Sequence, residues 1–293
     1  MTDTIRRPKA RFKLAAIGCS ALLTAAFPFI STSATAQVAE SPEPASLSYA
    51  RMAELASSSP TVARITVRSI VALKRERAPD LPETRSRFYV QAETLGLIRS
   101  DGVMSKRISF LVDGSAENAR RPNLKNKIFL AFGKVGQQVS EFQLSASTAL
   151  VPWTPANEAL ARKVIEDLYA PGAPGPITAI TSAFHVPGAI VGEGETQIFL
   201  GTADGSPISL SVIRRPQEQP HFSVSLGEVV DDSAKLPERD TLLWYRLACS
   251  LPDQLPALAL TELARNDAEA ASRDYNAFRA ALGPCDRTQT PVI

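Results

Sequence analysis

A two-residue alternation of apolar and polar side chains, repeated in short runs, restricts the fold of this sequence more than any other feature. In the first run Ala63, Ile65 and Val67 alternate with arginine and threonine, and the apolar pattern continues to Leu73. A period of two places every second side chain on one face, as in a half-buried β-strand. Four further short runs of this kind follow, at 88–92, 108–112, 128–132 and 139–144. Gly, Asp and Pro mark the joints and no long helical pattern intervenes, which favours an antiparallel meander or small barrel over a parallel sheet.

Two helices are expected to cover these strands. The first spans 46–57 and ends at the Ser-Ser-Ser-Pro run that follows it. The second begins after Trp153, because Thr154 is a suitable N-cap and Pro155 occupies the first helical position, where its missing N–H costs nothing. The segment 170–176, rich in Pro and Gly, ends that helix and predicts a domain boundary.

The second half of the chain predicts a three-stranded antiparallel meander followed by two helices. Its strands are expected at 196–200, 208–212 and 222–226. The serines on the opposite face of this meander predict that the face is solvated; they are Ser209, Ser211, Ser223 and Ser225. Apolar stripes predict one helix around 244–248 and a longer one that ends at Gly283-Pro284.

The amino-terminal residues have the three-part pattern of a secretory signal peptide. Five basic residues precede an uncharged apolar stretch from Leu14 to Ile30, and Ala34-Thr35-Ala36 follows. We expect cleavage after Ala36 and export to the periplasm; an uncleaved membrane anchor is the alternative. No second stretch is long and apolar enough to span a bilayer, so no stable span is expected after cleavage.

Export leaves two cysteines, Cys249 and Cys285, in an oxidising compartment, where thiols pair. A metal site is disfavoured because two distant cysteines without a nearby His are too few ligands, and a redox pair would need closer spacing. We therefore predict a structural disulfide that joins the two C-terminal helices.

Charge gives no sign of a nucleic-acid partner. The chain has 32 Lys and Arg residues against 30 Asp and Glu residues, and the first 36 residues hold five of the basic groups and one of the acidic groups. The remainder therefore has a net charge of 27 minus 29, or −2. Binding to nucleic acid or to an anionic membrane needs clustered basic charge, so neither partner is expected.

The sequence contains no recognisable catalytic set. It has no Gly-x-Ser-x-Gly nucleophile elbow and no phosphate-binding glycine loop. The strongest candidate is His185 with Glu193 and Glu195, because one imidazole and two carboxylates could hold a divalent cation or form an assisted base. The helical His pair of metalloproteases is missing, so an ordinary loop is the preferred interpretation, and neither a metal nor a cofactor is expected.

An arginine pair at the end of a strand is the second binding candidate. Arg214 and Arg215 could clamp a carboxylate or phosphate, although a charged edge that resists strand addition explains them equally well.

Two resemblances add to these inferences. The order of the first four strands, after a short helix, resembles the small OB-like barrels of many exported proteins. The segments 192–200, 244–249 and 283–285 resemble an uncharacterised family of exported alphaproteobacterial proteins. That resemblance implies export and a disulfide, and it implies no activity.

We therefore expect an α+β protein in which an antiparallel OB-like β-barrel precedes a β-meander packed with a disulfide-linked helix pair. The expected segments are a signal peptide (1–36), a linker (37–45), an OB-like β-rich domain (46–170) and the meander with its helices (171–293). The function expected first is that of a soluble, non-catalytic periplasmic binding or envelope-assembly module, whose partner is an envelope protein or a small ligand. A periplasmic hydrolase with a His/Glu or metal-dependent site and a protease-inhibitor-like barrel are the alternatives.

Overall fold

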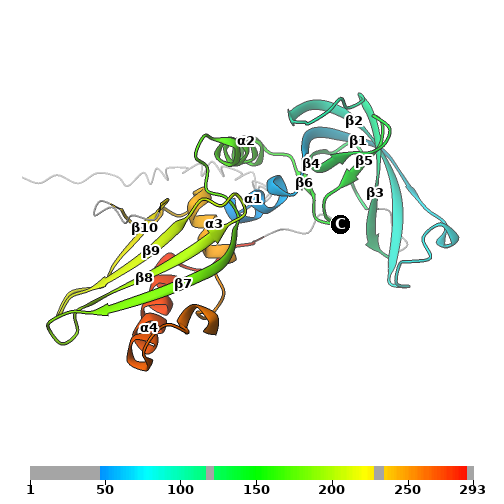
Figure 1. Cartoon of the computed structure of the whole chain (residues 1–293). Helices are drawn as coiled ribbons and strands as arrows, with labels where there is room; N and C mark the ends of the chain where they lie inside the picture. Colours follow the sequence, from blue (N-terminus) through cyan, green and yellow to red (C-terminus); the bar gives the residue numbers. More distant parts are fainter. Residues whose placement is uncertain (1–46, 117–121, 228–233, 289–293) are drawn as a thin grey trace, which may run out of the picture. The chain divides into compact units, whose positions relative to one another are not determined.

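The computed structural model describes residues 47–116, 122–227 and 234–288 (Figure 1). The expected signal peptide (1–36) and the linker that follows it (37–45) lie outside the described residues. These residues form two antiparallel sheets and four α-helices, which confirms the expected α+β class.

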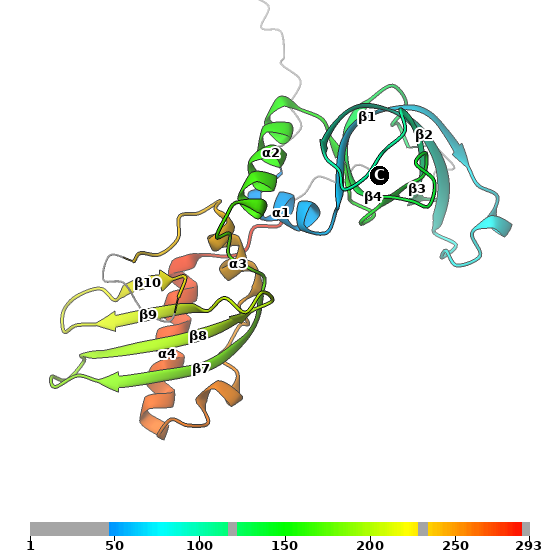
Figure 2. The ribbon, with the colours of Figure 1, turned by 45° about the horizontal axis from the view of Figure 1, so that its top comes forward.

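The first sheet is a nearly closed barrel built on the strands expected from the alternating pattern. Its strand order is β3-β2-β1-β4-β5, and β6 pairs with β4. Ser109 of β3 forms one parallel bridge with Glu141, which directly precedes β5, and the Ser109 N–H donates to the Ser140 carbonyl at 2.8 Å. Figure 2 shows how the sheet curls into a barrel. The strands are β1 (Thr61–Ala72), β2 (Arg85–Arg99), β3 (Arg107–Ser115), β4 (Ile128–Val135), β5 (Phe142–Leu144) and β6 (Leu150–Pro152).

Alternate side chains fill the inside of the barrel, as the two-residue period requires. Ile65, Val90 and Phe129 are buried in one apolar cluster. The rings of Phe110 on β3 and Phe142 on β5 meet edge to face, with centroids 6.5 Å apart, so aromatic packing continues beneath the two end strands. Close approach of β4 to β5 requires Gly133, because a Cβ at this position would lie 2.0 Å from the Gln143 carbonyl oxygen.

The second sheet has four strands where the sequence predicted three. Its order is β10-β9-β8-β7, and the additional strand β7 lies at one edge. The alternation of β7 was not recognisable because register shifts between Ile177 and Ala179 and between Ile180 and Ser182 interrupt it. The strands are β7 (Ile177–Pro187), β8 (Gly194–Thr202), β9 (Ile208–Arg214) and β10 (His221–Ser225).

The serine face of this sheet is not solvated at its centre, so that expectation was wrong. Ser209 and Ser211 are completely buried and Ser223 is 3% exposed. The Ser209 hydroxyl donates to the Gly227 carbonyl at 2.9 Å, and Phe199 is its neighbour on β8. A small side chain between larger cross-strand neighbours is shielded by them, which alternation alone does not reveal.

Three of the four helices in the described residues begin at a side-chain cap, and among these caps Thr154 was expected from the sequence. The four are α1 (Tyr49–Ser57), α2 (Pro155–Tyr169), α3 (Leu242–Ser250) and α4 (Arg265–Leu282), with short 3₁₀ turns η1 (Arg75–Arg77) and η2 (Ala257–Leu260). The hydroxyls of Ser48, Thr154 and Thr241 accept backbone N–H groups at the starts of α1, α2 and α3. Helix α4 runs along one face of the β7–β10 sheet, where Ile198, Tyr275 and Phe278 belong to one buried cluster (Figure 1).

The predicted disulfide between Cys249 and Cys285 is present. It joins the end of α3 to the segment that follows α4, and the Trp244 indole N–H donates to the Leu282 carbonyl at 2.9 Å in the same region.

Replacing both cysteines by serine is expected to lower the free energy of unfolding by about 3.5–4 kcal/mol. The bridge closes a sequence separation of 36 residues, and the loss follows from the larger conformational entropy of the unlinked unfolded chain. Urea unfolding monitored by circular dichroism measures the difference. Reductant should destabilise the wild type by a similar amount and leave the double variant unchanged; equal stability of wild type and variant contradicts the prediction.

Candidate functional site

A buried polar cluster connects three strands of the second sheet to helix α4. Asp274 on α4 is 1% exposed, and its carboxylate accepts hydrogen bonds from the Arg214 Nε and from the Thr196 hydroxyl. His185 lies opposite Thr196 on the neighbouring strand, with its Nδ1 2.9 Å from the Thr196 Oγ1 and 3.9 Å from Asp274. The cluster therefore combines an imidazole, a hydroxyl, a carboxylate and a guanidinium.

The donor and acceptor capacities of these groups determine which atoms carry the protons. A carboxylate only accepts hydrogen bonds, and a threonine hydroxyl has a single hydrogen, which Thr196 gives to Asp274. The Thr196 oxygen must then accept from His185, so the Nδ1 of His185 carries a proton. Gly194 makes room for the imidazole, because a Cβ there would lie 2.9 Å from the His185 Cε1.

Two of the candidate residues from the sequence meet in this cluster, and the residue that joins them was missed. His185 and Arg214 come together through Asp274. A signal was present in the sequence: Asp274 interrupts the apolar stripe formed by Ala271, Tyr275 and Phe278. A carboxylate on a buried helix face needs a buried partner, which is the reason to search for one.

The other three candidates lie elsewhere. Glu195 directly precedes Thr196 in β8, so its side chain lies on the opposite face of the sheet. There it accepts a hydrogen bond from the Gln197 amide at 2.8 Å. Glu193 lies in the turn between β7 and β8, and Arg215 lies beyond the end of β9, 3.8 Å from Glu218. The structure therefore does not bring His185, Glu193 and Glu195 together.

The geometry of the cluster suits a structural connection better than catalysis. Thr196 is completely buried, so its hydroxyl is not available as a nucleophile toward an external substrate. Within the described residues, no group of three or more His, Cys, Asp or Glu side chains is arranged to hold a metal ion. Buried charges need partners, and here β8 and β9 each supply one for the carboxylate of the helix, Thr196 and Arg214.

A cleft of about 1110 Å³ on the barrel is a more accessible candidate site. It extends from the outer surface of β2 and β3 across to β5 and the β4–β5 turn. Tyr89 and Leu111 are directly paired on neighbouring strands, and their side chains are 37% and 47% exposed. Its lining also includes Phe110, Val112, Asp113, Lys134, Gln137, Glu141, Phe142, Gln143 and Leu144.

Charged groups lie on both walls of this cleft. On β2 and β3 the Arg87 guanidinium donates to both oxygens of Asp113, at 2.7 and 2.9 Å. This bond holds the pKa of the Asp113 carboxyl below its usual range, against the opposing effect of burial. Lys134 and Glu141 belong to the opposite wall and are exposed. The cleft thus offers an apolar floor with polar groups of both signs above it.

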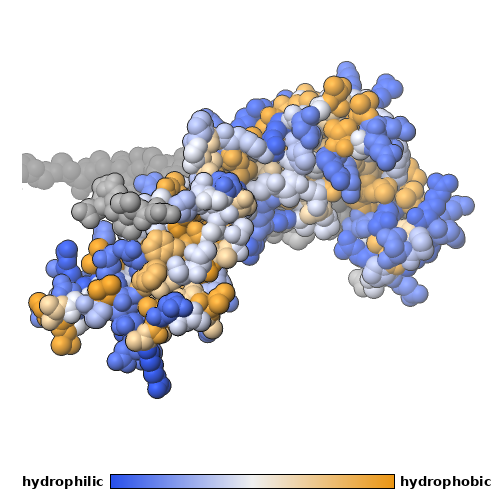
Figure 3. Space-filling view, in the orientation of Figure 1, coloured by the Kyte–Doolittle hydropathy of each residue, from blue (hydrophilic) through white to orange (hydrophobic). Residues whose placement is uncertain are grey.

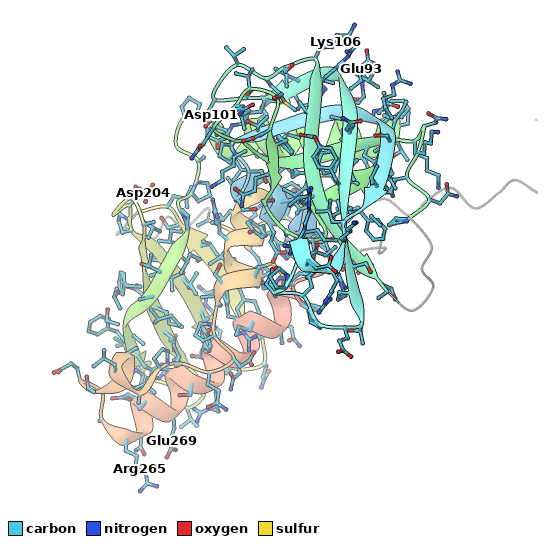
Figure 4. The ribbon with its side chains drawn as sticks, turned by 90° about the vertical axis from the view of Figure 1, so that its right-hand side faces the viewer. Glu93, Asp101, Lys106, Asp204, Arg265 and Glu269 are labelled. Carbon is cyan, nitrogen blue, oxygen red and sulfur yellow. A yellow bond between two sulfur atoms is a disulfide. The ribbon has the colours of Figure 1, made fainter. Side chains whose placement is uncertain are left out.

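The net charge differs strongly between the two parts of the chain, although the total net charge is close to zero. Residues 61–152, which include the barrel strands, contain fifteen Lys and Arg residues against eight Asp and Glu residues, a net charge of +7. Residues 153–293 contain eleven against eighteen, a net charge of −7. Some basic groups of the barrel form ion pairs with acidic ones. For example, the Lys106 Nζ lies 3.5 Å from the Glu93 carboxylate (Figure 4).

The second sheet also exposes apolar side chains, in β7 and its turn to β8. Phe184, Val186, Ile190 and Val191 are 50%, 66%, 62% and 97% exposed. Figure 3 shows apolar surface at this end of the sheet as well as on the barrel. The hairpin carries few polar groups that converge on one point, so it is a less specific candidate than the barrel cleft.

Comparison of the sequence with protein-family models and with curated proteins finds no match. In the described part of the chain, none of the helices has the length and apolar character needed to cross a membrane.

Asp274→Asn is expected to lower the free energy of unfolding by about 2–3 kcal/mol, because it removes the buried charge that pairs with the partly exposed Arg214. The matched control on the same helix is Glu269→Gln, which removes an exposed pair with Arg265 and should change stability by less than about 0.5 kcal/mol. Denaturant unfolding measures both variants. Equal effects would show that the Asp274 cluster contributes no more than a surface pair.

The lowered pKa of Asp113 predicts that part of the stability of the barrel depends on pH. Its pKa is lowered in the folded state, so it stabilises the fold above its ordinary pKa of about 4, and this stabilisation is lost as the pH falls through its lower folded value. Asp113→Asn should therefore melt at a lower temperature than the wild type at pH 7, and the difference should shrink in acid. Thermal melts across this pH range measure it, with the exposed Glu262→Gln as control; a difference that is constant with pH contradicts the assignment.

Proposed function

We infer that this chain is a non-catalytic binding module of the periplasm and that the barrel cleft is its ligand site. The observation that carries the proposal is the cleft itself, in which the exposed Tyr89 and Leu111 adjoin the Arg87–Asp113 pair. Pockets that bind ligands typically combine an apolar lining with a few well-placed polar groups that fix orientation.

Strand order supports an OB-like identity for the barrel. Five-stranded OB-like barrels are partly open, and ligands contact the outer surface of their second and third strands and the adjoining loops. Here the order β3-β2-β1-β4-β5 ends in two strands that meet at a single parallel bridge, and the cleft lies over β2 and β3. Under this proposal, α3 and α4 with their disulfide form a packed pair that stabilises the second sheet.

The sequence of the amino terminus and the disulfide support a periplasmic location. The basic residues, apolar stretch and Ala34-Thr35-Ala36 form the signal-peptide pattern. A disulfide persists in oxidising compartments and is rare in the cytosol.

The hydrolase alternative would place catalysis at His185. The Nδ1–H of His185 is hydrogen-bonded to the Thr196 hydroxyl, which in turn donates to Asp274. The Nε2 of His185 is therefore the ring nitrogen that could act as a base. His185 does not line the barrel cleft. Binding in the cleft and chemistry at His185 are therefore separable by mutation.

Ligand capture by the cleft should depend on Tyr89. Crosslinking and pull-down from intact periplasm, with metal analysis of the same purified sample, is the test. Tyr89→Ala should reduce capture about tenfold, because an aromatic platform at the centre of a site supplies a large part of the binding energy. Phe184→Ala is the matched control, an exposed aromatic outside the cleft, and His185→Ala should also leave capture intact.

The opposite pattern would overturn the proposal. Capture that is lost with Phe184→Ala and retained with Tyr89→Ala would move the site to the β7–β8 hairpin. Stoichiometric metal, with turnover abolished by His185→Ala, would favour the hydrolase.

A further inference from the structure

We propose that the barrel cleft binds an uncharged carbohydrate, a chain of pyranose sugars whose hydroxyl groups are equatorial. This inference rests on the proposed function and names its ligand class. The juxtaposition that carries it is an apolar strip on the outer face of β1, β2 and β3, with hydrogen-bonding side chains along both of its sides. Such a strip matches a molecule that is apolar on its faces and polar at its edges.

The apolar strip consists of Val71, Tyr89 and Leu111. Val71 pairs with Tyr89, and Tyr89 pairs with Leu111, so the three side chains lie side by side on one face of the sheet. Val71 is 49% exposed, and the other two are also exposed. The strip is therefore an apolar surface that solvent reaches, with an aromatic ring at its centre.

A row of hydroxyl, amide and carboxylate groups borders the strip on one side. Ser69 pairs with Gln91, and Gln91 pairs with Ser109. Ser109 in turn forms the bridge to Glu141. The Ser69 hydroxyl donates to the Gln91 Oε1 at 2.8 Å, which leaves the amide hydrogens of Gln91 as donors for a ligand.

Paired charges border the strip on the other side. Arg87 pairs with Asp113 across β2 and β3, and its guanidinium donates to both carboxylate oxygens. The charge of each is therefore compensated before a ligand binds. The far wall of the cleft adds Glu141 and the pair of Lys134 with Gln143. Two basic and two acidic side chains line the cleft, so it has no net charge.

This lining determines the ligand class. A ligand with a net charge finds no excess countercharge, and a purely apolar ligand would take water from the flanking polar groups without replacing its hydrogen bonds. A hydroxyl group both donates and accepts, so a ligand rich in hydroxyls satisfies amide, hydroxyl and carboxylate groups alike. Strand addition by a peptide needs an unpaired edge, whereas the Ser109 N–H is already bonded to Ser140.

The shape of the strip selects the stereochemistry of the sugar. A pyranose ring with equatorial hydroxyls has apolar C–H groups on its faces and hydroxyls around its edge. One face then stacks on Tyr89, while the edge hydroxyls reach the polar groups on either side. An axial hydroxyl would point into the apolar strip and lose its hydrogen bonds to water. Neighbouring strands are about 4.8 Å apart, comparable to the length of one sugar unit, so a chain that crosses the strands places about one unit on each side chain of the strip.

The test titrates the full mature chain with cellohexaose, a neutral hexasaccharide of β-1,4-linked glucose with equatorial hydroxyls. Isothermal titration calorimetry should show saturable binding. The β-1,4-linked mannose hexasaccharide, which has an axial hydroxyl on each ring, should bind at least about tenfold more weakly. Absence of cellohexaose binding, equal binding of the two sugars, or tighter binding of the β-1,4-linked glucuronic acid hexasaccharide would overturn the proposal.

Variants separate ring stacking from hydrogen bonding. Tyr89→Phe keeps the ring and should bind cellohexaose within about twofold of the wild type, whereas Tyr89→Ala should bind about tenfold more weakly. Gln91→Ala removes a flanking donor and should weaken binding about threefold. Phe184→Ala, an exposed aromatic outside the cleft, is the matched control and should leave the affinity unchanged. Circular dichroism verifies the fold of each variant.

Nuclear magnetic resonance locates the site without a variant. The resonances of Tyr89 and Leu111 should shift when cellohexaose binds to the unmodified protein. Shifts at residues 184–191 in their place would overturn the proposal.

The failure of this inference is distinguishable from failure of the proposed function. If Tyr89-dependent capture from the periplasm succeeds while cellohexaose does not bind, the carbohydrate inference is wrong and the binding module stands. A protein crosslinked through the cleft in that capture would identify a peptide ligand instead. If neither the periplasmic extract nor the sugar gives cleft-dependent binding, both are wrong.

Discussion

Everything proposed for this protein depends on the double pairing of β1. This twelve-residue strand pairs with β2 along one edge and with β4 along the other, and three register shifts lie along its pairing with β2. Such irregularities increase the local twist and bend of a sheet, which brings its outer strands toward each other. The curl is almost complete, since Ser109 of β3 forms a parallel bridge with Glu141, which directly precedes β5. Because the barrel is not completely closed between β3 and β5, a cleft remains on its surface.

A nearly closed barrel combines an outer surface with a partly open edge. Its outer surface carries side chains such as Tyr89 and Leu111. An open edge is usually a risk, because it invites pairing with other chains. Here the edge of β3 borders the cleft, whose lining includes Phe110 and Phe142.

In the second sheet, a buried polar cluster has a structural role. Asp274 sits on a helix face that is otherwise apolar, and its burial is compensated by Thr196 and Arg214 from two different strands. Because a buried carboxylate is costly without such partners, the cluster favours one register of α4 against the sheet. His185, which from sequence looked like a metal ligand or base, is bonded to the same hydroxyl.

Local pattern alone determined the elements whose signals are local. Thr154 with Pro155, and the alternation from Ala63 to Val67, specify a helix start and a strand because hydrogen bonds and side-chain direction depend on residues close in sequence. The disulfide also followed from the sequence, since Cys19 lies in the expected signal peptide and the two cysteines that remain have one pairing. Tertiary structure decided the rest: β7 was concealed by its register shifts, the serines of β9 and β10 were buried by neighbours on other strands, and Asp274 met His185 and Arg214 from far along the chain. Such contacts join residues tens of positions apart, and their formation depends on how the sheets curve and pack, which no short stretch of sequence encodes.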